Sequence, residues 1–500
     1  MVYNARMKQS SGIETLPPES MDINKTIAHI EQVLKDDEGS SPALIAAVHM
    51  MLMLVKLLTG RLGLNSRNSS KPPSDDKNGD KKKKTKSDKP QGGQVGHKGS
   101  TLGLVDNPDN VISLPVDTAS LPAGNYHDAG IERRQLFNIK ISRVVTEYQA
   151  QILKNEQGKK FVAPFPDGVT QGAQYGASVK ANAVYMSMFQ LIPYDRVQLH
   201  FNEMYGIPIS TGSLFNFNKL AYHRLAQFEE IAKQQLFQSN LIHADETSIN
   251  VNGKRIWLHN ASNNNWTLIA PHQKRGKEAM DEIGILPNFT GVLCHDHWKP
   301  YYRYEAVSHS LCNAHHLREL TRAHEQDQQS WAKEMHTLLT ELNVVVDEEG
   351  GQLSTDNIEL WQMKYRQLLD KAEIECPPPP EPAADRDAKK RGRVARSKAR
   401  NLLERLRTFE DDVLRFMKEK HVPFTNNQGE RDIRMTKVQQ KISGCFRSME
   451  GAKIFCRIRS YLSTCQKNGV GVGLALECLM KGEPLPDFIQ IEIDKLQDAE

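Results

Sequence analysis

Three strand-like segments joined by two tight turns, within residues 241–270, constrain the fold of this chain more than any other feature. The first segment ends at Asn252 and Gly253, and an Asn-Gly pair between apolar-patterned runs is the strongest short-range signal for a β-hairpin. The second segment, 254–261, alternates apolar and polar residues again, and three asparagines at 263–265 make the next turn. The pattern therefore predicts three consecutive antiparallel strands.

The segments that follow predict an extension of this sheet by parallel strands. Residues 274–283 are charged and predicted to be helical, whereas 291–296 is a short apolar run that ends on an acid, as a buried parallel strand would. Residues 309–312 form another such run, and a helix is predicted from about Ala314. This order of elements is similar to that of the α/β ribonuclease-H-like fold, in which the fourth strand pairs beside the first.

That pairing would make Asp245, on the first predicted strand, a neighbour of Asp296, which ends the fourth. In-line attack on a phosphodiester is assisted by two Mg²⁺ ions about 3.5–4 Å apart. Mg²⁺ takes a few carboxylates and keeps positions for water and phosphate, so two strand aspartates and Glu430 are suitable ligands. A second interpretation of Glu430 is a helix capping box with Asn427 as N-cap, and the two roles are compatible.

The motifs around these acids resemble those of the large transposases of the insertion-sequence-sixty-six family, over roughly residues 26–480. They are His-Ala-Asp245-Glu-Thr, His-Asp296-His-Trp-Lys-Pro-Tyr-Tyr, His-Ser-Leu-Cys-Asn-Ala-His-His-Leu-Arg-Glu-Leu320, Asn-Asn-Gln-Gly-Glu430-Arg, Lys-Ile-Ser-Gly-Cys-Phe-Arg-Ser and Arg-Ile-Arg-Ser-Tyr-Leu-Ser-Thr-Cys-Gln-Lys-Asn-Gly469. The resemblance implies a DDE-type transposase with Asp245, Asp296 and Glu430 as catalytic residues and metal ligands. It also implies Mg²⁺, or Mn²⁺ in its place, double-stranded DNA as transposon ends and target, and small accessory proteins of the same element.

Cysteine usage bounds the cofactors and the compartment. The chain has seven cysteines, the first at Cys294, in no paired framework. With no signal peptide recognised, this predicts a reducing cytoplasm, and the resemblance implies a bacterial, nucleoid-associated protein. No zinc is expected, although the following histidines, with Cys294 and Cys312, are a rival metal set: His243, His295, His297, His315 and His316. The longest apolar run, 43–58, is shorter than the about 20 residues of a membrane span, so no membrane segment is predicted.

The N-terminal part predicts self-association and a basic tether. Residues 1–20 are expected to be a flexible tail and 21–65 a helical segment whose apolar residues form a heptad seam, which predicts a coiled coil and a homo-oligomer. Packing of this helix on its own chain is the alternative. The seam comprises Leu44, Val48, Met51, Val55, Leu58 and Leu62. Residues 66–100 predict a basic disordered linker, in which Lys81, Lys82, Lys83 and Lys84 are candidate phosphate contacts.

The middle of the chain predicts two accessory modules. Residues 101–170 have scattered strand patterns and are expected to be a small zinc-ribbon-like module without its metal cysteines, stabilised by packing. Residues 171–235 are expected to be a helical DNA-binding region with a helix-turn-helix at 194–225, or an ordinary helical hairpin. Its candidate DNA contacts are Asn216, Asn218, Lys219 and Arg224.

The catalytic domain is predicted to span 236–480, with a helical insertion at about 321–415 and a C-terminal tail at 481–500. Helices are expected at 317–346 and 357–375, and a basic stretch at 386–407 is a candidate surface for the transposon end or a solvated helix. The helix that carries Glu430 places four basic residues on one face as candidate DNA contacts: Arg431, Arg434, Lys437 and Lys441.

Two alternatives to a transposase remain open at this point: a ribonuclease-H-like nuclease without strand transfer, and a non-catalytic DNA-binding relative. Glu246, on the opposite face of the strand from Asp245, and Asp432, about 200° around the helix from Glu430, are expected to tolerate substitution.

Overall fold

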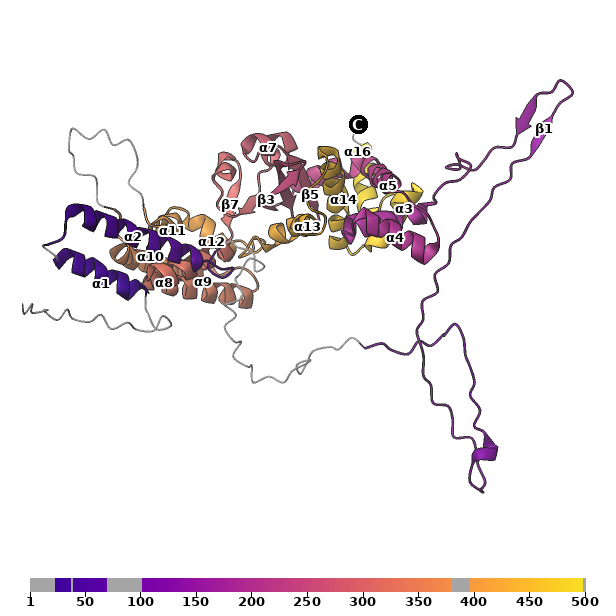
Figure 1. The fold of residues 1–500 in the computed structure, drawn as a ribbon, viewed down its shortest axis with the longest axis horizontal. Coiled ribbons are helices and arrows are strands. Elements are labelled where there is room, and N and C mark those ends of the chain that lie inside the picture. Colours follow the sequence, from indigo (N-terminus) through magenta and orange to yellow (C-terminus); the bar gives the residue numbers. More distant parts are fainter. Residues whose placement is uncertain (1–22, 37–38, 70–100, 380–395, 498–500) are drawn as a thin grey trace, which may run out of the picture. The chain divides into compact units, whose positions relative to one another are not determined.

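The computed structural model describes residues 23–36, 39–69, 101–379 and 396–497 (Figure 1). These residues divide into two compact units. One contains the described residues of Met1–Lys77 together with Asn313–Glu410, and the other contains those of Asn78–Cys312 and Asp411–Glu500. The predicted tail at 1–20, Lys81–Lys84 and most of the predicted linker lie outside the described residues.

The second unit is built around a five-stranded mixed sheet. Its strands are β3 (Leu241–Val251), β4 (Lys254–Ser262), β5 (Thr267–His272), β6 (Val292–His295) and β7 (Ser308–Leu311). They are ordered β5-β4-β3-β6-β7. The first three pair antiparallel, while β3–β6 and β6–β7 pair parallel. The predicted pairing of the fourth strand beside the first is therefore confirmed.

The turn residues explain this register. Asn252 and Gly253 both have positive φ, 48° and 79°, as a two-residue hairpin turn that matches the twist of its strands requires. Asn263 closes the next turn, because its side-chain oxygen accepts hydrogen bonds from the backbone N–H groups of Asn265 (2.9 Å) and Trp266 (2.7 Å). The chemistry of these turns thus accounts for the pairing of β3–β5 from residues close together in the sequence.

Helices and 3-10 turns complete the second unit. They are α3 (Ala177–Val184), the π-helical η4 (Tyr185–Phe189), α4 (Tyr194–Tyr205), α5 (Thr211–Arg224), α6 (Ala226–Phe237), α7 (Lys277–Ile283), η5 (Leu286–Asn288), η6 (Lys299–Arg303), α12 (Glu410–Lys418), α13 (Asn427–Ser443), α14 (Met449–Lys467), α15 (Val472–Lys481) and α16 (Asp487–Gln497).

The α14 helix covers the open edge of β5. Buried Ser460 and Thr464 accept hydrogen bonds from the backbone N–H groups of Ile269 (2.8 Å) and Thr267 (3.1 Å). Without these bonds, the backbone N–H groups at the edge of β5 would be left unpaired, in an apolar interior or open to pairing with another chain. Two hydroxyls on one helix face therefore replace the missing neighbouring strand.

The other unit is all-helical. Its helices are α1 (Ile23–Asp36), α2 (Pro42–Leu62), α8 (Asn313–Asp327), α9 (Ser330–Glu348), α10 (Thr355–Glu375) and α11 (Lys398–Thr408). The single helix predicted at 317–346 is wrong, because the chain breaks at Gln328, which has a φ of 55°. The insertion predicted at about 321–415 corresponds to α8–α11.

The predicted N-terminal helix is confirmed as α2, which has Ser41 as N-cap and ends before Gly63. Its Lys56 forms an ion pair with Glu31 of α1 (2.6 Å), and most of its apolar side chains are exposed. By length and composition, α2 also qualifies as a membrane span, the one helix among the described residues that does so. Core helices of soluble proteins and signal sequences share that property.

The small packed module predicted at 101–170 is wrong. The described elements there are η3 (Thr118–Ser120) and a two-stranded pair of β1 (Ile152–Lys154) and β2 (Lys160–Val162). No residue from 101 to 174 is buried, so this segment has no core of its own. The segment therefore lacks the packed core that was expected to stabilise it in the absence of zinc-binding cysteines.

Candidate active site

Strand register brings Asp245 and Asp296 side by side. The parallel pairing of β3 with β6 matches Ile242 with Leu293 and His243 with Cys294. Asp245 lies on β3 two residues beyond the last of these pairs, and Asp296 directly follows the end of β6. Neighbouring strands lie about 4.7–4.9 Å apart, so the two acids are close neighbours where β6 ends beside the middle of β3, although they are far apart in the chain.

The first turn of α13 carries Glu430 to the same place. The preceding residue Asn426 is anchored in β3, with its amide oxygen 2.8 Å from His243 Nδ1 and its amide nitrogen donating to Ala244 O (2.8 Å). Asn260 of β4, which is opposite Asp245 in the register, donates to Gly429 O (3.2 Å). These bonds fix the start of α13 over the strand end.

The capping box expected around Asn427 is wrong. The N-cap of α13 is Asn426, and its side chain makes no capping hydrogen bond because it is engaged with β3. Sequence reasoning missed Asn426, His243 and Asn260 as anchors of the site. The doubled Asn-Asn before Gln-Gly-Glu430 is the signal that was available, since one of two consecutive amides can cap while the other packs.

Gly429 allows α13 to approach β3 closely. A Cβ built at this position would lie 3.0 Å from Asn426 Oδ1 and 3.3 Å from His243 Cβ. Few side chains tolerate such contacts, so a larger residue must displace the amide that anchors the helix. Glu430 is the next residue and would move with it.

We therefore expect Gly429→Val to impair the site more than the fold. Overpacking of this kind costs about 1–3 kcal/mol of stability, while a displacement of about 1 Å in a catalytic group lowers rates by about 10²-fold. The matched control is Gly473→Val in α15, because nothing lies within 4 Å of a Cβ built there. Urea unfolding and a metal-titration assay on both variants check this, and equal behaviour of the two would contradict it.

The carboxylates of the cluster act on one another electrostatically. Burial raises the pKa of Asp245 well above its ordinary value of 3.8, and the charges of Glu246, Asp296 and Glu430 raise it further. One hydrogen bond, from the backbone N–H of Glu246 (2.9 Å), opposes the rise. Repulsion among buried carboxylates is relieved by protons or by cations.

The donor set fits a hard divalent cation. The three candidate ligands offer carboxylate oxygens, which Mg²⁺ and Mn²⁺ prefer over the nitrogen and sulfur ligands that favour zinc. Two of the histidines considered as rival ligands are otherwise engaged: His243 with Asn426, and His295 with His309 (3.0 Å). Burial lowers the pKa of both imidazoles, so they pack as neutral rings.

Glu246 faces the other side of the sheet, as predicted from strand alternation. Its carboxylate accepts hydrogen bonds from Tyr301 Oη (2.6 Å) and Arg275 Nη2 (2.6 Å). The Arg275 guanidinium lies over the rings of Trp257 and Trp298, 4.7 and 4.3 Å from their centroids. Burial and the nearby Asp296 raise the pKa of Glu246 to about 7. A buried, paired Glu246 is not the neutral control residue that was expected.

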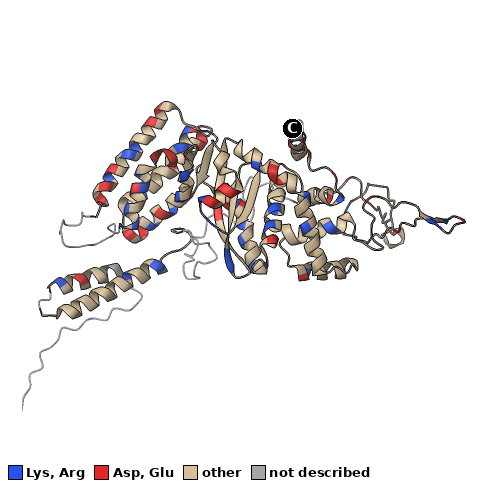
Figure 2. Ribbon diagram, turned by 90° about the horizontal axis from the view of Figure 1, so that it is seen from above, with Lys and Arg blue, Asp and Glu red and all other residues tan. Residues whose placement is uncertain are grey.

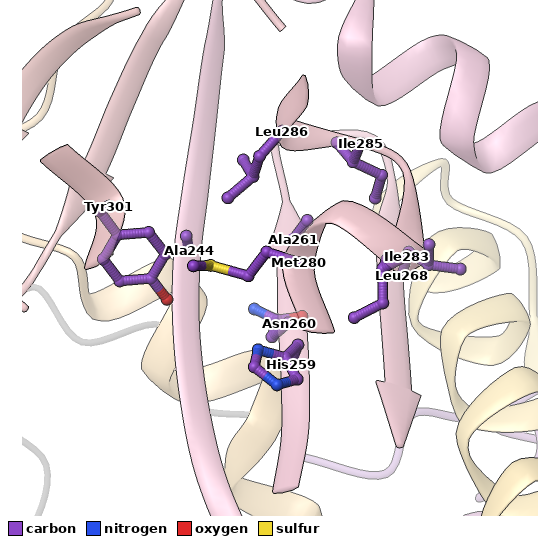
Figure 3. Close-up of a pocket in the computed structure, with 10 residues that line it drawn as sticks. All are labelled: Ala244, His259, Asn260, Ala261, Leu268, Met280, Ile283, Ile285, Leu286 and Tyr301. Carbon is purple, nitrogen blue, oxygen red and sulfur yellow. The ribbon is translucent and has the colours of Figure 1, made fainter. Parts of the chain in front are cut away.

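Figure 3 shows the apolar packing on this face of the sheet, where Tyr301 and Met280 approach Ala244 of β3. The loop after β6 is fixed by the same contacts, because Tyr301 binds Glu246 and the Trp298 N–H donates to Asp296 Oδ1 (3.1 Å). His297 has a φ of 68° in this loop. The loop that carries Asp296 is therefore held by the backbone N–H of Trp298 on Asp296 itself and, further along, by the bond from Tyr301 of η6 to Glu246.

Comparison with known protein families identifies the family of the chain. A family model described as Transposase IS66 family matches residues 172–454, more than half of the chain. The chain belongs to the IS66 transposase family. A second model, a family of unknown function, matches residues 15–102. No curated protein matches the chain.

In this transposase, three of the four basic residues predicted on the α13 face are exposed. Arg431, Arg434 and Lys441 face solvent, whereas Lys437 is half-buried and its ammonium donates to Ser248 O of β3. Burial lowers the pKa of Lys437. Lys437 therefore fastens α13 to the sheet, and the exposed three remain candidate phosphate contacts.

Two helices occupy the region predicted at 194–225 of the transposase, α4 and α5, but most of the expected DNA contacts on them are used inside the unit. Asn218 is fully buried and donates to Tyr194 Oη (2.8 Å). Arg224 donates to Leu479 O (2.6 Å), and Lys219 pairs with Glu450 of α14 (2.7 Å). Asn216 is exposed. The expectation that Asn218 reads bases is therefore wrong, and α5 packs as one helix of a hairpin.

The described basic residues of the transposase insertion are largely neutralised by acidic neighbours. Arg400 pairs with Glu373 (2.6 Å) and Glu404 (3.0 Å), and Arg407 pairs with Asp370 (2.9 Å). Lys/Arg and Asp/Glu residues are interleaved along these helices (Figure 2). The α11 face is thus an ion-paired surface rather than a strongly positive one, and residues 380–395 lie outside the described part.

Proposed function

We propose that the chain is a DDE transposase that binds the ends of its insertion sequence and catalyses Mg²⁺-dependent DNA cleavage and strand transfer. The observation that carries the proposal is the convergence of Asp245, Asp296 and Glu430 in a chain of the IS66 transposase family. In the sheet, β6 has a parallel neighbour on each side, β3 and β7, and Asp296 directly follows β6. This strand order supports a ribonuclease-H-like catalytic domain.

In this mechanism, Asp245, Asp296 and Glu430 would hold two divalent cations. When bound, the cations lower the pKa of the attacking water or 3′ hydroxyl and stabilise the charge that develops on the phosphate and leaving oxygen. Asn426 and Gly429 position Glu430, and the Glu246–Arg275–Trp298 contacts position Asp296. Arg431, Arg434 and Lys441 bind the DNA backbone beside the carboxylates without reading its sequence.

Metal binding should be visible without any DNA. A group whose pKa is raised on folding stabilises the protein below its unfolded pKa, and that contribution is lost as pH rises through the folded pKa. Asp245 is such a group, so the metal-free protein should lose stability toward pH 8. Mg²⁺ binds the ionised carboxylates, so we expect it to raise the melting temperature more at pH 8 than at pH 5.

Thermal unfolding with and without Mg²⁺ at the two pH values tests this expectation. In Asp245→Asn the Mg²⁺ effect should shrink by at least half, while the matched surface variant Glu305→Gln should keep it. An equal Mg²⁺ effect in wild type and Asp245→Asn would contradict the assignment of Asp245. Zinc analysis of the purified protein completes the test, and we expect less than one zinc per chain.

Cleavage of the element's own terminal repeats decides between the transposase and its alternatives. A transposase nicks these ends and joins the exposed 3′ hydroxyl to a second DNA. A nuclease without strand transfer would yield cut ends and no joined product, and a non-catalytic relative would bind without cutting. Joined products that appear in Mg²⁺ or Mn²⁺ and depend on Glu430 are the result expected.

We also propose that α2 contributes to a homo-oligomer through its heptad seam. Met51 and Leu58 of the seam are exposed, 59% and 58%, whereas Leu52 is buried. Met51→Asp with Leu58→Asp should raise the dimer dissociation constant at least tenfold, about 1.4 kcal/mol. Sedimentation analysis measures it, with His49→Asp as the control outside the seam. Unchanged self-association would indicate that α2 packs on its own chain and does not form a dimer interface.

A further inference from the structure

The arm, residues 101–174, is a long stretch of chain without an interior. Figure 1 shows it as two extended excursions, one ending in η3 and the other near β1 and β2. Its own sheet comprises the three-residue pairing of β1 with β2, and Gln135 bonds the backbone N–H and carbonyl of Val105 (2.8 and 2.7 Å). Contacts such as these bury no side chain of the arm.

The arm nevertheless has the composition of a buried element. Twenty-one of its large apolar side chains are exposed, among them Ile131 (89%), Ile139 (88%) and Val144 (84%). Single exposed apolar residues are ordinary, and large exposed apolar patches mark interaction surfaces; in the arm such residues recur from Leu102 to Phe165 in a segment with no interior. At the ordinary area of such side chains they present on the order of 1,000 Å² of apolar surface, against about 800 Å² per partner in a stable protein–protein interface.

The charge of the arm argues against nucleic acid as the occupant. It carries eight acidic and seven basic residues, which nearly cancel. DNA binding is driven by an excess of Lys and Arg over phosphates, whereas this surface is apolar and nearly neutral. A protein surface is the complementary partner.

The backbone of the arm adds an edge to this apolar surface. Around β1 and β2, Ile152 pairs with Val162 and Leu153 with Phe161, and all four side chains are more than half exposed. A two-stranded ribbon is marginal in water on its own, and its outer edges can accept a further strand. The ribbon is therefore a docking element that needs a second surface.

We propose that the arm docks on a second copy of this chain and forms an interface of a homodimer. An identical copy has the same near-neutral apolar surface. In a dimer with a two-fold axis, the commonest symmetry of soluble oligomers, each arm can therefore cover the apolar side chains of the other. The base of the arm is held to its own chain, because Arg143 donates to Gly206 O (3.1 Å) and Tyr175 packs edge-on against Phe217. The interface is separate from α2 and goes beyond the proposed catalytic function.

Site-specific photocrosslinking on the full chain tests this interface. p-Benzoylphenylalanine at position 161, in the ribbon, should give a covalent species of twice the chain mass, in at least tenfold higher yield than the same group at position 474. Leu474 is the matched control because it is an exposed apolar residue of α15 (62%). Neither DNA nor catalysis is needed, so the outcome is independent of the proposed transposase activity.

A second measurement addresses variants of the arm. Ile139→Lys with Val144→Lys should raise the dimer dissociation constant at least tenfold without lowering the unfolding temperature, because neither side chain is buried in one chain. Crosslinks confined to the same chain, or formed with added DNA and not between chains, would overturn the proposal. So would a yield at position 161 no higher than at position 474.

Discussion

Asp245→Asn, Asp296→Asn and Glu430→Gln should each lower DNA cleavage by at least about 10²-fold, the scale of losing one preorganised catalytic group. Each change is nearly isosteric and removes one negative charge from a cluster in which repulsion already raises the pKa of Asp245. Because the three carboxylates serve one site, a double substitution should be scarcely worse than a single one. Nicking of the terminal repeats in Mg²⁺ is the measurement.

The same variants should remain folded and should still bind DNA. Without Mg²⁺, removing one charge lowers the electrostatic repulsion among the buried carboxylates. We therefore expect Asp245→Asn to be at least as stable as wild type in the metal-free protein. Glu305→Gln, at an exposed position after η6, is the matched control and should retain most activity. Cleavage by Asp245→Asn at nearly the wild-type rate would remove the basis of the proposed mechanism.

Asp432→Asn should destabilise the protein by about 3 kcal/mol, within the range for breaking a buried ion pair. Asp432 and Lys467 lie 2.8 Å apart, with side chains 6% and 11% exposed. The ammonium also donates to Asn263 O (2.8 Å) and Trp266 O (3.2 Å), so the pair ties α13 and α14 to the β4–β5 turn. Loss of the carboxylate leaves Lys467 charged and buried without a counter-charge.

Urea unfolding of wild type and variants measures this loss. Asp432→Asn combined with Lys467→Met should recover part of it, because removing both charges avoids an isolated buried ion. Glu450→Gln is the control, since its pair with Lys219 is about half exposed and such pairs contribute about 0–1 kcal/mol. A stability of Asp432→Asn within about 0.5 kcal/mol of wild type would show that α13 is held without this pair.

Asp432 also shows where sequence reasoning reached its limit. The helical repeat turns this residue about 200° from Glu430, which suggested that Asp432 would tolerate substitution. The structure instead places α14 on that side, so the carboxylate is buried. Periodicity states the direction of a side chain relative to its own helix, but what lies in that direction is decided by another segment of the chain.

The sequence determined the parts of the fold that depend on local chemistry. Asn252 and Gly253 require positive φ and make the hairpin, Asn263 closes the next turn, and Ser41 and Gly63 set the ends of α2. The alternation along β3 likewise determined that Asp245 and Glu246 face opposite sides of the sheet. Each of these follows from residues a few positions apart, whose steric and hydrogen-bonding preferences act without tertiary contacts.

Tertiary structure alone decided how these parts are used. It made Asn426 an anchor to β3 rather than leaving Asn427 to cap α13, buried Asn218 away from DNA, and neutralised Arg400 with Glu373 and Glu404. It also left the arm uncovered where a packed module was expected. Burial, ion pairing and close approach depend on residues distant in the sequence, and their energies exceed the small local preferences that a sequence pattern records.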